Sequence, residues 1–79
     1  MKEKEVELSF KKVKIWEVKF LEMSDIDDTS KKTLTKGTLK LCTDLTEDEI
    51  ENLSASDGMK LMKEVNMLNG FGTANFQQA

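Results

Sequence analysis

The segment Ser54–Phe71 constrains the fold most, because it carries a start signal, an apolar stripe and a stop signal for one helix. Ser54 and Asp57 have the S-x-x-D spacing, in which the serine oxygen accepts from a first-turn amide and the acid lies at the positive end of the helix dipole. Gly70 supplies the stop, because glycine adopts the left-handed conformation that closes a helix. The apolar residues that recur at helical spacing are Leu61, Met62, Val65 and Leu68. We therefore predict a helix over 55–69 that packs by one face.

Alternating apolar and polar residues near the N-terminus predict a β-hairpin. We place its strands at about 5–10 and 13–20, with a turn at Lys11-Lys12, and we expect the charged residues 1–4 to fray. The apolar phase shifts by one residue at Trp16, and such a shift moves side chains to the opposite face of a strand. The shift indicates either a β-bulge or a strand covered on both sides.

The middle of the chain supports two interpretations. Ser24 and Asp27 repeat the S-x-x-D spacing and favour a helix over 25–42. The threonine-rich stretch 33–41 also fits a second hairpin with Gly37 in its turn, because threonine favours strands and a glycine inside a helix costs about 1 kcal/mol relative to alanine. On the residues alone, both interpretations stay open.

A capping box of the form T-x-x-E begins at Thr46 and predicts a short helix over 47–53. The expected fold class is therefore α+β, with an N-terminal β-hairpin followed by about three helices. A chain of 79 residues forms one small domain, which we place at 1–71 and follow with a flexible tail at 72–79. Domains of this size are modestly stable alone, so we expect a protein partner or a homo-oligomer.

Net charge and cysteine content indicate which partners and which cell compartment to expect. The net charge of −3 argues against a dedicated nucleic-acid binder, because such domains carry a basic excess. The single cysteine, Cys42, excludes an internal disulfide and fits a reducing cytosol. The charged N-terminal sequence lacks an apolar signal core, and no apolar run reaches the length of a membrane span. We therefore expect a cytoplasmic protein without a membrane partner.

The residues do not predict catalytic, metal or cofactor chemistry. The chain has no histidine, so Cys42 lacks the usual base of a cysteine nucleophile. We interpret Cys42 as a small buried hydrophobe. The acidic residues between Glu22 and Asp28 lack the spacing and central glycine of a calcium loop. We expect no enzyme activity and no cofactor.

Two groups of residues are candidates for contact with a protein partner. Met59 and Met67 lie off the apolar stripe of the last helix, so they belong either to the core or to an adaptable interaction surface. If 25–42 is helical, its lysines at i, i+4 and i+8 form a stripe that either faces an acidic partner or is solvated. The candidate partner-binding residues are Met59, Met62, Met67, Phe71, Lys32, Lys36 and Lys40.

The order of these elements resembles the tail assembly chaperones of long-tailed bacteriophages, particularly those of Mu-like phages and prophages. The segment 45–50, LTEDEI, is similar to the family pattern L-(S/T)-x-E-E-(I/L), and the similarity continues through Ser54 and Asp57 to Phe71. The segment 20–26 is similar to the family's strand-exit segment but lacks its arginine and proline. The family pattern has a helix across 26–42, so the resemblance favours helix for the middle segment.

The resemblance implies a non-enzymatic role in the bacterial host cell. Such proteins bind the long, helical tape-measure protein in many copies before the tail tube polymerises around it. The competing hypothesis is a small regulatory or adaptor protein that binds a folded protein partner or DNA, for which helices 46–53 and 57–69 would form a helix-turn-helix.

Overall fold

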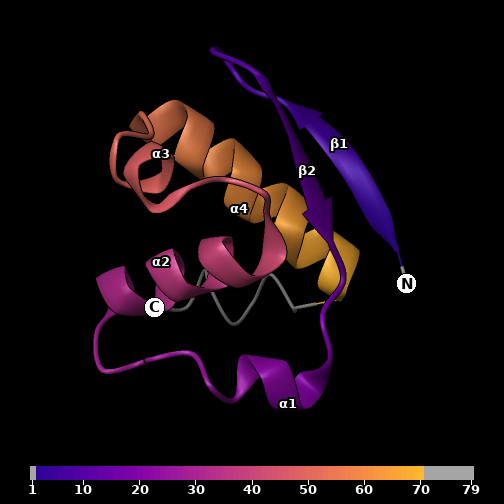
Figure 1. Cartoon of the computed structure of the whole chain (residues 1–79), viewed down its shortest axis with the longest axis vertical. Helices are drawn as coiled ribbons and strands as arrows, with labels where there is room; N and C mark the ends of the chain where they lie inside the picture. The colour runs from indigo at the N-terminus through magenta and orange to yellow at the C-terminus, as the bar shows by residue number, and fades with distance from the viewer. Residues whose placement is uncertain (1, 71–79) are drawn as a thin grey trace.

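The computed structural model describes residues 2–70 and shows an antiparallel hairpin followed by helices (Figure 1). The elements are β1 (Glu3–Glu7), β2 (Lys12–Trp16), α1 (Phe20–Met23), α2 (Lys31–Cys42), α3 (Glu47–Glu51) and α4 (Ala55–Asn69). This architecture confirms the predicted α+β class. The predicted tail 72–79 and Phe71 lie outside the described residues.

Helix α4 has the bounds that the sequence predicts. The Ser54 hydroxyl oxygen accepts from the Asp57 amide at 3.1 Å, and Gly70 ends the helix with a φ of 72°. Leu61 and Val65 are fully buried on the face that packs against the sheet and α2. Figure 1 shows the hairpin lying along α4, with α2 on another side of the same helix.

The hairpin differs from the prediction in its ends. The strands pair with Val6 opposite Val13, and the loop between them closes where the Leu8 amide donates to the Lys11 carbonyl at 2.9 Å. β1 begins at Glu3, which pairs with Trp16, so the expectation that residues 1–4 fray is wrong for residues 3 and 4. Oppositely charged residues face each other across the sheet, and they support this register.

The second strand ends at Trp16 rather than continuing to residue 20, so both interpretations of the apolar phase shift are wrong. The Glu17 amide still donates to the Lys2 carbonyl at 2.9 Å, but the next amide, that of Val18, donates to Asn69 Oδ1 of α4 at 2.8 Å. The Trp16 indole N–H donates to the Leu41 carbonyl at 2.9 Å and fixes the end of α2 beside it. The phase shift therefore marks the end of the strand, and Phe20 starts α1.

The stretch 33–41 is helical, but the predicted helix 25–42 is wrong at its start. α2 begins at Lys31, with Ser30 as the N-cap that accepts from the Thr33 amide at 3.1 Å. Asp27 instead accepts from the amide and hydroxyl of Thr29, which forms a turn. The short helix α3 is also two residues shorter than predicted, because Asn52 is its C-cap.

Gly37 lies inside α2 because Ile26 packs directly on its backbone. A Cβ atom at position 37 would lie 2.6 Å from Ile26 Cγ2, which is closer than such atoms approach. The α1–α2 connection thus returns to the surface of α2, and a larger residue at position 37 would displace it.

We expect Gly37→Ala to be neutral or destabilising in the wild-type chain, because the displacement of Ile26 offsets the helix-propensity gain of about 1 kcal/mol. In an Ile26→Ala background the same change should stabilise the domain by about 0.5–1 kcal/mol. Urea denaturation of the four variants of this cycle measures the difference. Equal effects of Gly37→Ala in both backgrounds would show that Ile26 does not restrict position 37.

One apolar core joins the hairpin to α2, α3 and α4. Its buried members are Val6, Leu8, Val13, Ile15, Leu39, Cys42, Leu45, Ile50, Leu61 and Val65. Burial raises the pKa of the Cys42 thiol to about 11, and the negative charge of Glu22 adds to the effect. Cys42 is therefore the buried hydrophobe that the sequence predicts. Among the described residues, no helix is both long and apolar enough to cross a membrane.

Candidate partner-binding surfaces

The outer face of α4 carries two of the candidate methionines in exposed positions. Met59 is 74% exposed and Met67 is 54% exposed. They are eight residues apart, which corresponds to about 12 Å along a helix. Met62, in contrast, is partly buried and packs against the core cluster. The structure therefore places Met62 against the core, whereas the side chains of Met59 and Met67 are exposed and can contact a partner.

Sequence reasoning missed other exposed apolar side chains. Phe20 and Leu21 are 81% and 76% exposed on α1, and Phe10 is exposed in the β1–β2 loop. The alternating pattern predicts that Phe10 and Phe20 lie in strands. The signal that separates Phe20 from the strand is the apolar phase shift at Trp16.

The predicted lysine stripe does lie on α2, but two of its three members bind α3. Lys36 Nζ lies 2.9 Å from Glu47 Oε1 and 3.6 Å from Glu51 Oε1. Lys40 Nζ lies 3.6 Å from Glu47 Oε2. The hydrogen bond from Lys36 lowers the pKa of the Glu47 carboxyl, and the same contact raises the pKa of Lys36. These two lysines join α2 to α3, whereas Lys32 is exposed.

A groove of about 460 Å³ lies between the first turns of α2 and the α3–α4 region. We call it the lysine groove. Its rim and floor include Lys31, Lys32, Lys36, Leu39, Ile50, Leu53 and Gly58. The floor is apolar, and the α2 rim is cationic. The lysine groove therefore contains two of the candidate lysines, together with apolar residues that the sequence did not single out.

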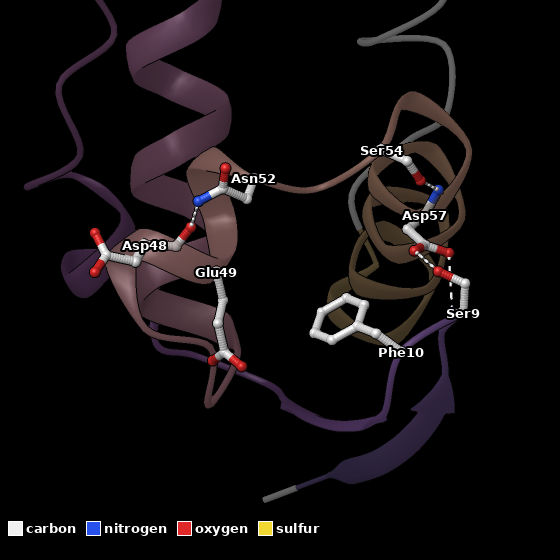
Figure 2. A pocket seen from close by; sticks show the side chains of 7 residues that line it. All are labelled: Ser9, Phe10, Asp48, Glu49, Asn52, Ser54 and Asp57. Atoms are coloured by element: carbon white, nitrogen blue, oxygen red, sulfur yellow. Dashed lines mark hydrogen bonds between the residues drawn. The ribbon is translucent and has the colours of Figure 1, made fainter.

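A second hollow, of about 440 Å³, lies between the β1–β2 loop, α3 and the start of α4 (Figure 2). Its lining residues are Ser9, Phe10, Asp48, Glu49, Asn52, Ser54 and Asp57. Two of its three acidic side chains, those of Glu49 and Asp57, form internal contacts. Glu49 accepts from the Thr46 amide at 2.9 Å and pairs with Lys11 at 2.7 Å, and the Lys11 contact is the main reason that its pKa is lowered.

In this hollow, the Asp57 side chain of α4 forms hydrogen bonds with the β1–β2 loop. Its carboxylate accepts from the Ser9 amide at 3.2 Å and from the Ser9 hydroxyl, as the dashed lines in Figure 2 show. The hydroxyl hydrogen bond is the main cause of the lowered pKa of Asp57. The side chain is largely buried, and its contacts account for both oxygens. We therefore interpret this hollow as a structural junction.

Asp57→Asn should make folding stability less dependent on acid pH. Because the folded-state pKa is lowered, ionised Asp57 stabilises the fold above its ordinary pKa of 3.8, and this contribution is lost as pH falls through the lower folded-state value. We expect the variant to be less stable at pH 7 and to approach the wild type once the pH has fallen below the folded-state pKa of Asp57. Urea midpoints measured across this range test the effect, with the exposed Asp28→Asn as control. Parallel curves for Asp57→Asn and wild type would contradict it.

Within the described part of the chain, no group of three or more histidine, cysteine, aspartate or glutamate residues could hold a metal ion. The helix 55–69 contributes one unusual polar group, the buried Asn66, whose Oδ1 has no hydrogen-bond partner among residues 2–70. No protein-family model, curated protein or solved structure matches this chain.

Proposed function

We propose that this domain is a non-enzymatic tail assembly chaperone that binds the tape-measure protein of a phage or prophage in the bacterial cytoplasm. The observation that carries the proposal is the outer face of α4, where Met59 and Met67 are exposed along the longest helix. The resemblance of most of residues 5–71 to tail assembly chaperones is the reason for proposing the tape-measure protein as the partner.

Exposed methionines suit a chaperone that covers apolar helices of varied sequence. Methionine is unbranched and polarizable, so it adapts to differently shaped apolar surfaces. Exposed apolar side chains on a small protein also mark sites of protein contact when they gather on one face. A long partner that offers many similar helix faces would bind many copies, each contact being weak and the whole assembly being strengthened by avidity.

Co-expression tests this proposal. We expect the partner to be a very long, coiled-coil-rich protein encoded downstream of this gene, and a tail-tube gene upstream would support its identity as the tape-measure protein. We expect the partner to be insoluble alone, and to become soluble and co-purify when this domain is present. An unrelated acidic protein of similar size serves as the control. If the partner stays insoluble and does not co-purify, the proposed function is wrong.

The adaptor or DNA-binding hypothesis makes a different prediction. It requires specific binding of duplex DNA with a steep dependence on salt concentration. The exposed charges of α3, which are Glu47, Asp48 and Glu51, are all negative and repel a phosphate backbone. Charge at this surface therefore favours a protein partner over DNA.

A further inference from the structure

We propose that the lysine groove binds an acidic helical segment of the protein partner. The carboxylates of that segment would lie over Lys31 and Lys32, and its apolar side chains would lie on the groove floor. This inference rests on the proposed function, because it names the kind of tape-measure segment that the groove accepts.

The floor of the lysine groove offers apolar contact. Leu39 and Ile50 are core residues that reach the floor, and Leu53 packs partly buried beside them. On the α4 side, Gly58 keeps the wall open, since no atom lies within 4 Å of the place where a Cβ would be.

The rim of the lysine groove is cationic. Its charged side chains are three lysines and Glu51. Lys36 is already paired with Glu47 and Glu51, so the charge available to a partner comes from Lys31 and Lys32. Both are exposed, and neither forms an ion pair with any residue between 2 and 70. A partner with carboxylates beside its apolar residues complements this rim.

Lys31 and Lys32 lie at electrostatically unfavourable positions in α2. They occupy the first turn of α2, where the helix dipole favours acidic residues. α3 and α4 each carry acid in the first turn, whereas α2 has none. Lys31 and Lys32 therefore stand where they oppose the dipole of their own helix, and an acidic partner would relieve this repulsion.

The walls of the groove favour a helix over an extended peptide. An added strand needs a free sheet edge with unpaired amides and carbonyls, but these walls are helices α2, α3 and α4. A helix satisfies its own backbone hydrogen bonds and can present apolar residues at i, i+3 and i+4 to the floor. Carboxylates one turn away on the flanks of that helix would then face the α2 rim.

Two synthetic peptides test this inference by fluorescence polarization with the full chain. Both are amphipathic helices of about five turns with the same leucine face, and one carries glutamates on its flanks where the other carries lysines. We expect the wild type to bind the acidic peptide at least about tenfold more tightly at low salt, with the preference shrinking as salt is added.

The variant Lys31→Glu/Lys32→Glu should lose this preference while folding at least as well as wild type, because negative charge is favourable in the first turn of α2. The matched control is Lys2→Glu/Lys19→Glu, which makes the same change of net charge at exposed positions outside both the groove and α4. It should keep the preference. Thermal unfolding of both variants checks the fold.

Equal binding of the two peptides, equal loss in both variants, or no binding of either peptide would overturn the inference. These outcomes are separable from failure of the proposed function. A wild type that binds the acidic peptide but not the tape-measure protein would keep the groove inference and exclude the proposed function. A wild type that solubilises the tape-measure protein without any peptide preference would exclude the groove inference alone.

Discussion

Leu61→Ala is expected to destabilise the domain by about 2–5 kcal/mol. Leu61 is fully buried in α4, at the centre of the core that joins the hairpin to α2. Removing its side chain loses the transfer free energy of the buried atoms and leaves a cavity. A domain of this length has a total stability of about 4–12 kcal/mol at the usual stability per residue. The variant should therefore lose a large part of its stability, as measured by urea denaturation followed by circular dichroism.

Met59→Ala is the matched control in the same helix. Because the Met59 side chain is exposed, its truncation should change stability by no more than about 0.5 kcal/mol. If Leu61→Ala unfolds at the same urea concentration as wild type, then Leu61 is not buried in the core between α4 and the hairpin.

Met59→Asp/Met67→Asp is expected to weaken binding of the tape-measure protein by at least about tenfold, which corresponds to about 1.4 kcal/mol. Both positions are exposed on the outer face of α4, so the changes put charge into the proposed contact without disturbing the core. Buried charge without a partner is costly, so an apolar helix face of the tape-measure protein would no longer pack there. The loss of affinity is measured as the increase in the amount of variant that is needed to keep the tape-measure protein soluble.

The control for this variant is Lys12→Gln/Lys19→Gln, which lowers the net charge equally at exposed positions outside α4. It should solubilise the tape-measure protein as wild type does. If the methionine variant also does so, then the outer face of α4 is not the contact surface.

The helices with local signals could be predicted from the sequence, and α4 is the clearest case. Its cap, apolar stripe and terminal glycine are all encoded within the helix and its neighbours, so its bounds match the prediction. The same applies to the start of α3 at the Thr46 capping box.

The ends of the hairpin and the start of α2 could not be predicted, because contacts distant in sequence determine them. The Val18 amide bonds to Asn69, which lies 51 residues further along the chain. Ile26 and Gly37 have helical spacing in the sequence, but Ile26 belongs to the α1–α2 connection and packs on Gly37 from outside the helix. Sequence periodicity does not distinguish residues on one continuous helix from residues of two segments that pack together.

The candidate surfaces were predicted in part. The sequence placed Lys32, Lys36 and Lys40 on one helix, but it gave no sign that α3 would return to pair with two of them. The free charge therefore lies at the N-terminal end of the stripe, at Lys32 and at the neighbouring Lys31. Periodicity did separate Met67 from the core stripe, but it grouped Met62 with both the core and the partner-binding residues.

The native mass of the purified complex with the tape-measure protein shows whether this domain coats its partner in many copies. Light scattering coupled to size-exclusion chromatography would give the number of copies of this domain on each partner chain. Our account predicts a soluble complex with many copies on one partner, because each exposed α4 face covers only a short apolar stretch. Separate elution of the two proteins, or a complex with a single copy, would contradict it.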